Sequence, residues 1–291
     1  MAIEMTFDGN FVINNKVSMR TLAQTYLGMQ KALERAYLDI ERGGISKYET
    51  IRDEDRRATE FYLESYREGS FISVFKAATP ILKRTIDRLS STINDRYSIA
   101  IKDGDIEHQK IIQEAKERLL IMGAQPINYE DALNDSSIYI PKQYARKSML
   151  NHFSDSLVPI KKNDGENSIN YRLAGDSSYE FYFDANIATR FTRSLQGKEL
   201  GSEIKYESYV IRLDGNNQKG VIRHKFNNKE ATIFFINYSD YNIATEYLKQ
   251  NEASHPLSAM RFIGYAIKEL NALDLANGDI IFKALVKEEN G

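Results

Sequence analysis

The chain of 291 residues contains no cysteine, no tryptophan and only four histidines. Without cysteine there can be no disulfide, no thiol nucleophile and no zinc–thiolate site. The histidines are also scattered along the sequence, which does not favour a zinc site built from several imidazoles. The sequence therefore predicts neither a bound metal nor a cofactor.

An excess of charge of one sign is also missing, because 39 Lys and Arg residues face 41 Asp and Glu residues and the net charge is −2. This balance argues against a uniformly basic, histone-like protein and against one that coats membranes. No apolar run approaches the roughly 20 residues of a membrane-spanning helix, and no signal-peptide pattern opens the sequence. We therefore expect a cytoplasmic protein with no membrane partner.

Hairpins and long helices are predicted in the first half of the chain. A turn at Asp8-Gly9-Asn10 predicts a hairpin of residues 3–7 with 11–13, and a second hairpin joins 57–66 to 71–76. Ser18 is a candidate N-cap, and Gly43-Gly44 is a typical helix end. Between them the apolar residues form one narrow stripe. Helices are predicted from residue 18 to 43, from Thr79-Pro80 through Tyr97, and over residues 111–122 and 142–153.

Short strands separated by Asn- and Gly-rich turns dominate the last third of the sequence. They are predicted at residues 169–173, 179–183, 204–213, 220–226, 231–237, 260–269 and 279–287, with one helix over 241–249. We expect an α+β fold in which N-terminal hairpins and long helices precede a small antiparallel β-barrel-like domain. The predicted domains are an α+β scaffold or assembly domain at residues 1–160 and a mainly β recognition domain at 161–291.

The motifs of common nucleotide-binding and hydrolytic enzymes are missing. Gly215 and Gly220 have the spacing of a phosphate-binding loop, but Val221-Ile222 stands where that loop needs Lys and Ser or Thr. A hairpin turn explains these glycines better.

Three residues fit the layout of a metal-dependent nuclease. Asp184 follows a predicted strand, and Glu203-Ile204-Lys205 places a carboxylate and a lysine on one face of the next strand. Such carboxylates can hold Mg²⁺ while the lysine orients water. An ion pair on a solvated strand face is the simpler interpretation.

A second candidate is Arg146, five intervening residues and His152 on a predicted helix. This spacing resembles the catalytic motif of HEPN ribonucleases, in which histidine serves as acid or base. HEPN proteins are all-helical, whereas this chain is rich in predicted strands. A surface helix with a basic face is the alternative.

A basic stretch lies within residues 186–229, which hold nine Lys or Arg and four acidic side chains, a local charge of +5. Aromatic residues are interleaved with the basic ones. Cations neutralise phosphates and aromatic faces stack on unpaired bases, so a β-module here could bind single-stranded nucleic acid. The candidate nucleic-acid-binding residues are Arg190, Arg193, Lys205, Arg212, Arg223 and Lys225.

Two parts of the chain carry a resemblance. One is the first strand and long helix with the hairpin Glu64-Ser65-Tyr66-Arg67-Glu68-Gly69-Ser70; the other is the C-terminal run from Val210-Ile211-Arg212 to Gly264-Tyr265-Ala266. Together they resemble a group of uncharacterised bacterial and phage accessory proteins of about 300 residues, with an N-terminal α/β part and a small β-barrel part. The resemblance implies a setting in phage–host conflict but assigns no catalytic residue.

We therefore predict a non-enzymatic binding or assembly protein that acts through protein–protein contacts, in antiphage defence or its phage-encoded inhibition. The helical stripe that contains Tyr26 and Tyr37 fits an inner face of this domain and fits a homo-oligomer contact equally well. Two alternatives use the C-terminal β-domain: nucleic-acid binding by the basic stretch, and a Mg²⁺-dependent nuclease with catalytic Asp184, Glu203 and Lys205.

Overall fold

The computed structural model describes residues 2–46, 49–67, 71–76, 79–102, 126–138, 143–161, 166–253, 258–270 and 272–286. Its helices and several sheets give a mixed α+β architecture. The chain divides into two compact units, one of residues 1–106 with 142–197 and one of residues 107–141 with 198–291.

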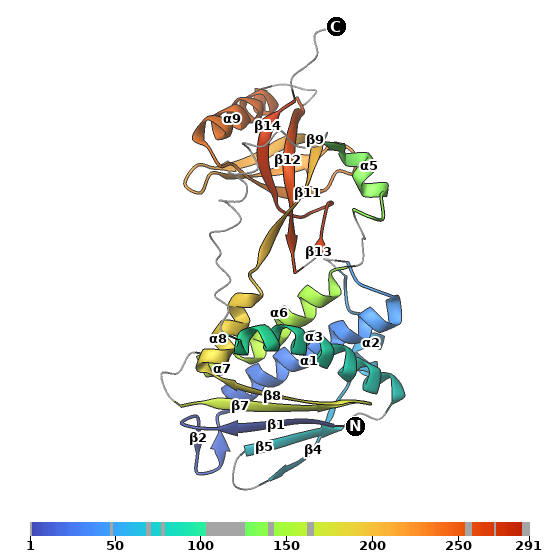
Figure 1. The fold of residues 1–291 in the computed structure, drawn as a ribbon, viewed down its shortest axis with the longest axis vertical. Coiled ribbons are helices and arrows are strands. Elements are labelled where there is room, and N and C mark those ends of the chain that lie inside the picture. The colour runs from blue at the N-terminus through green and yellow to red at the C-terminus, as the bar shows by residue number, and fades with distance from the viewer. Residues whose placement is uncertain are drawn as a thin grey trace. The chain divides into compact units, whose positions relative to one another are not determined.

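The first unit is built on an antiparallel five-stranded sheet in the order β4-β5-β1-β7-β8. The strands are β4 (Tyr62–Arg67), β5 (Phe71–Lys76), β1 (Ala2–Asp8), β7 (Ser168–Ala174) and β8 (Ser178–Asp184). The predicted hairpin between β4 and β5 is confirmed. In Figure 1 the helices of this unit gather on one face of the sheet.

The predicted first hairpin is wrong. Strand β1 pairs with β5 on one side and β7 on the other, whereas the short strands β2 (Val12–Ile13) and β3 (Lys16–Val17) pair only with each other. Ile3, Met5 and Phe7 are almost fully buried, so β1 is a central strand. Partner strands more than 60 positions away in the sequence bury these side chains, whereas the nearby residues 11–13 do not pair with β1.

Helix α1 (Met19–Arg42) confirms the strongest helix prediction. The Ser18 side chain accepts a hydrogen bond from the Thr21 amide (3.1 Å), and Gly43 ends the helix at φ 60°. Helix α3 (Pro80–Ile101) starts at the expected proline.

Four shorter helices complete the described part of this unit: α2 (Asp53–Ala58), α6 (Ala145–Ser156), α7 (Val158–Lys161) and α8 (Ala185–Ser194). Helix α6 corresponds to the one predicted over 142–153. Helix α2 occupies residues that were expected to begin a strand at 57, and α8 was not predicted. The helix predicted over 111–122 lies outside the described residues.

The second unit holds five of the seven strands predicted for the β-domain, together with the short strands β6 and β13. They are β6 (Ile127–Asn128), β9 (Lys198–Asp214), β10 (Lys219–His224), β11 (Glu230–Phe234), β12 (Met260–Glu269), β13 (Ala272–Leu273) and β14 (Ile280–Leu285). Helix α5 (Tyr129–Asn134) follows β6, and α9 (Tyr238–Ala253) connects β11 to β12.

Strand β9 is long enough to pair with two neighbours, β10 and β12. From β10 the pairing continues to β11, then β14, then β12, and so returns to β9. This ring is uneven, because β11 and β14 share only the pairs Ile233–Ile280 and Phe234–Ile281, and a closed barrel is not confirmed. A core that includes Tyr206, Ile222 and Phe262 fills the concave side of the sheet.

The predicted boundary at 160/161 does not separate the two compact units. Strands β7 and β8 follow that position, yet they complete the sheet of the first unit through the pairing of β7 with β1. The second unit in turn includes β6 and α5, which precede it, and β6 pairs in parallel with β9.

Candidate functional site

Outward-pointing side chains of β9, β10 and β11 form three cross-strand rows. Asp214, Lys219 and Phe234 are aligned in the first row, and Arg212, Val221 and Thr232 in the second. In the third row Arg223 lies between Tyr209 and Glu230. The intervening residues point inward, as the burial of Ile222, Ala231 and Ile233 shows. We call the outward surface that comprises Arg212, Lys219, Val221, Arg223, Thr232 and Phe234 the β10–β11 face.

A β-bulge determines the direction of Arg212. In β9, Val210 pairs with Ile222 and Arg212 pairs with Val221, so Ile211 is an extra residue without a partner in β10. Val210 is buried, and regular alternation would have turned position 212 inward as well. The bulge shifts the alternation by one residue, and Arg212 is therefore exposed on the outer surface.

The β10–β11 face is hollowed. A cavity of about 580 Å³ lies over its first two rows, and its lining includes Arg212, Lys219 and Phe234. Asp279, which directly precedes β14, lines the same hollow. The site is therefore concave, with two cations, a half-buried aromatic ring and the carboxylates of Asp214 and Asp279 on its walls.

Most cations near this face already have a counter-ion. Lys219 lies 3.8 Å from Asp214, Arg223 2.8 Å from Glu230, and Lys225 2.6 Å from Glu207. The Lys225 hydrogen bond lowers the pKa of the Glu207 carboxyl, and Glu207 in turn raises the pKa of Lys225. These pairs neutralise much of the positive charge that the sequence places in this stretch.

Arg212 is different, because it makes no ion pair or hydrogen bond with any side chain in the described part of the chain. Its neighbours in the row, Val221 and Thr232, carry no charge. An exposed guanidinium on the wall of a concave surface can bind an anionic group in a planar, two-pronged geometry.

Aromatic surface lies beside the cations. Phe234 is partly exposed and packs along one edge on the cluster of Leu200, Tyr265 and Ile281. The Lys198 ammonium lies 5.8 Å from the Phe234 ring centre. An aromatic face next to an unpaired arginine provides the two contacts that an unpaired nucleotide uses, base stacking and phosphate binding.

The six predicted nucleic-acid-binding residues belong to three different parts of the fold. Arg212, Arg223 and Lys225 lie on or beside the β10–β11 face. Lys205 is exposed on the part of β9 that pairs with β6 and β12. The other two, Arg190 and Arg193, belong to helix α8 of the first unit. Sequence reasoning missed Lys219 and Phe234, whose outward positions follow from strand alternation in β10 and β11.

The three nuclease candidates each have a structural environment of their own. Glu203 accepts hydrogen bonds from Lys283 (2.6 Å) and from the Tyr265 hydroxyl (2.8 Å), and the Glu203 side chain is 17% exposed. Asp184 belongs to the first unit and Glu203 to the second. Lys205 is exposed. Across the described residues, no three acidic or histidine side chains come together as a metal-binding group.

Asp184 caps helix α8, because its carboxylate accepts a hydrogen bond from the Ile187 amide at 2.7 Å. We expect Asp184→Ala to lower the free energy of unfolding by about 1 kcal/mol, while Asp184→Asn stays within a few tenths. Urea unfolding checks both values. A metal-ligand role predicts instead that both variants abolish Mg²⁺-dependent cleavage, and that Asp184→Asn does so without a loss of stability.

The Arg146 and His152 pair is also accounted for by local contacts on α6. Arg146 forms an ion pair with Asp95 (3.1 Å), and His152 lies 3.6 Å from Asp155. Burial lowers the pKa of His152, so its imidazole is neutral at pH 7. Six positions apart on a helix, the two side chains point in different directions. Met149, Leu150 and Phe153 of α6 are fully buried, so α6 is a packed helix rather than the surface helix with a basic face.

In the described part of the chain, every helix is too short or too polar to cross a lipid bilayer. No known protein family, no curated protein and no solved structure matches this chain.

Proposed function

We propose that the chain is a non-enzymatic binding protein whose second unit binds single-stranded nucleic acid on the β10–β11 face. The observation that carries the proposal is the exposed, unpaired Arg212 beside the half-exposed Phe234 in one hollow. The order of the strands gives further support.

Strands β9, β10, β11, β12 and β14 follow one another in the chain as a five-stranded Greek key. A long first strand pairs with the second and the fourth, and a helix separates the third from the fourth. This connectivity is that of the OB-fold, in which strands two and three and the loops 1–2 and 4–5 bind oligonucleotides. The hollow lies at the corresponding place, since Asp214, Lys219 and Asp279 border those two loops.

The charge pattern predicts moderate affinity. Arg212 supplies one unpaired cation, and the 3.8 Å separation of Lys219 from Asp214 leaves Lys219 able to turn toward a phosphate. Arg223 and Lys225 would first have to leave closer carboxylates. Few phosphates are then neutralised, so affinity should fall with salt less steeply than for a uniformly basic protein.

The test is fluorescence anisotropy with a labelled oligothymidine, against the same sequence in a duplex. We expect Arg212→Ala to weaken single-strand binding roughly tenfold through loss of a phosphate contact, and Phe234→Ala to do so by a similar factor through lost stacking. Arg172→Ala is the matched control, because Arg172 is an exposed strand arginine of the first unit. It should leave affinity unchanged.

Three results would contradict the proposal. They are the absence of binding at low salt, an affinity that does not change with salt concentration, and equal affinities for Arg212→Ala and the wild-type protein. Mg²⁺-dependent loss of the oligonucleotide would support the nuclease alternative instead.

A further inference from the structure

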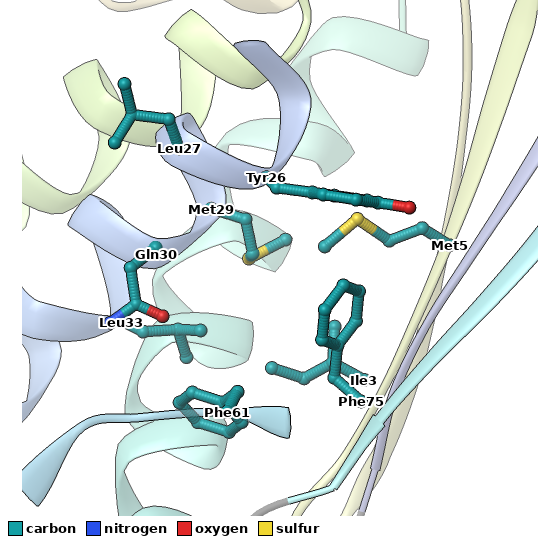
Figure 2. A pocket seen from close by; sticks show the side chains of 9 residues that line it. All are labelled: Ile3, Met5, Tyr26, Leu27, Met29, Gln30, Leu33, Phe61 and Phe75. Atoms are coloured by element: carbon teal, nitrogen blue, oxygen red, sulfur yellow. The ribbon is translucent and has the colours of Figure 1, made fainter. Parts of the chain in front are cut away.

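The first unit contains a second cavity, which lies between helix α1 and the sheet (Figure 2). Tyr26 and Met29 reach it from α1, while Met5 and Phe75 reach it from strands β1 and β5. Phe61, which directly precedes β4, closes one end. The volume of the cavity is about 340 Å³.

The polar groups in the lining already have partners. The Tyr26 hydroxyl is hydrogen-bonded to the Ser73 hydroxyl, and the Gln30 amide donates to the Thr59 carbonyl at 3.0 Å. None of the described lining side chains is charged. A charged or strongly polar ligand would lose its hydration here without gaining a partner, so the chemistry selects an uncharged, apolar occupant.

The lining also favours aromatic rings over other apolar groups. Tyr26 and Phe75 pack edge to face with ring centres 5.0 Å apart, and Phe61 supplies a third ring. The sulfur atoms of Met5 and Met29 add soft, polarisable contacts that suit the edge of an aromatic ring. In Figure 2 these side chains surround one common space.

Size and access fit a small molecule. The cavity is roughly twice as large as a 150 Å³ protein cavity that holds one benzene. One of its lining residues, Leu27, is 55% exposed, so the cavity reaches the protein surface. A ligand could therefore enter without unfolding of the unit.

From these observations we propose that this cavity is a binding site for an uncharged aromatic molecule of one or two fused rings. It belongs to the first unit and uses none of the residues of the β10–β11 face. A failure of the nucleic-acid-binding proposal would therefore not affect this proposal, and the reverse also holds.

Naphthalene is the probe, because its emission can be followed without a tryptophan background in this chain. We expect saturable binding with a Kd on the order of 0.1 mM, typical of an apolar ligand of this size. Met29→Phe places a phenyl ring in the cavity from the helix side and should weaken binding at least roughly tenfold, since the two fused rings of naphthalene and this third ring exceed a space about twice that of a one-benzene cavity. Met19→Phe, a substitution at an 86% exposed position of the same helix, should leave Kd unchanged.

A second measurement uses the wild-type protein and therefore does not depend on whether a variant folds. With methyl-labelled methionine, ring currents from bound naphthalene should shift the NMR signals of Met5 and Met29 but not those of Met19 and Met149. Lack of saturable binding, an unchanged Kd in folded Met29→Phe, or shifts confined to other methionines would overturn the proposal. Shifts at Met5 and Met29 would uphold it even if Met29→Phe failed to fold.

Discussion

A valine in place of Gly28 is expected to lower the free energy of unfolding of the first unit by about 3–5 kcal/mol. Gly28 lies in the middle of α1, where α6 crosses it. A Cβ atom at this position would lie 2.5 Å from the backbone nitrogen of Ser156 and 2.8 Å from its Cα. Both are backbone atoms of a packed helix, so the clash cannot be relieved by a change of rotamer. The two helices would have to move apart.

A smaller substitution, Gly28→Ala, is expected to change the stability in the direction opposite to that of Gly→Ala in an exposed helix. In an exposed helix, Gly→Ala stabilises by about 1 kcal/mol, because alanine loses less backbone entropy on folding. At Gly28 we expect the same change to destabilise, since a single methyl group already meets Ser156. Urea unfolding followed by circular dichroism measures both variants. A gain in stability for Gly28→Ala would show that α1 and α6 are not in this close contact.

Gly43→Ala is the matched control for this pair of helix variants. Nothing lies within 4 Å of a Cβ atom at position 43, but its φ of 60° is in the left-handed region. Alanine there should cost only about 1 kcal/mol, from backbone strain without a clash. The contrast separates steric exclusion at Gly28 from the ordinary requirement for glycine at a helix end.

Elements with a strong local signal could be predicted from the sequence. Helix α1 has a serine cap, one apolar stripe and a terminal glycine, and all three act within a few residues of one another. The β4–β5 hairpin is likewise a local pairing. The five longer strands of the second unit, β9, β10, β11, β12 and β14, were located for the same reason, because each contains an apolar run bounded by turn residues.

Long-range pairing could not be predicted. The position of β1 depends on β5 and on β7, which lies more than 160 positions later in the sequence. A single sequence carries no signal for such a partnership, so the domain boundary was placed between strands that share one sheet. Residues 126–138 are similar, because β6 joins the second unit only through its pairing with β9.

The candidate site could likewise be predicted from the sequence only in part. Charge and aromatic content pointed to the stretch that contains Arg212, Arg223 and Lys225. Which of these cations keeps a counter-ion depends on cross-strand neighbours such as Glu230. The bulge at Ile211, which turns Arg212 outward, leaves no mark in the sequence pattern. The protein–protein role, the homo-oligomer and the phage–host setting stay predictions from the sequence.

Acidification from pH 7 to pH 4 is expected to remove about 3 kcal/mol of stability from the second unit through His224. This imidazole is fully buried in the core of the unit, where it packs against the rings of Tyr129 and Tyr206, whose centres lie 4.5 and 5.6 Å away. Its Nδ1 is 3.0 Å from the Ser208 hydroxyl, and its Nε2 has no hydrogen-bond partner among the described residues.

The direction of the effect follows from the cause of the pKa shift. Burial lowers the pKa of His224 from 6.5 to about 4, because the cationic ring would be desolvated with no acceptor for its second proton. Between these two values the unfolded chain binds a proton that the folded chain does not. The contribution to stability is therefore complete above pH 6.5 and is lost progressively as the pH falls to 4.

Urea unfolding at a series of pH values, with a probe of the second unit, tests this prediction. His224→Phe keeps an aromatic ring packed against Tyr129 and Tyr206 but cannot be protonated. We expect it to be less stable by about 1 kcal/mol at pH 7, because the Ser208 hydroxyl loses its partner. The loss of stability between pH 6.5 and 4.5 should be much smaller in this variant.

His152→Gln removes the corresponding histidine of the first unit, where burial also lowers the pKa of the imidazole. It is used beside His224→Phe in the same pH series. Lowered carboxyl pKa values, such as that of Glu207, affect stability only at still lower pH, below the ordinary value of 4.5. The window from pH 6.5 to 4.5 therefore reports on the histidines. If the wild-type protein and His224→Phe lose stability in parallel across that window, His224 is not a buried neutral imidazole in the folded protein.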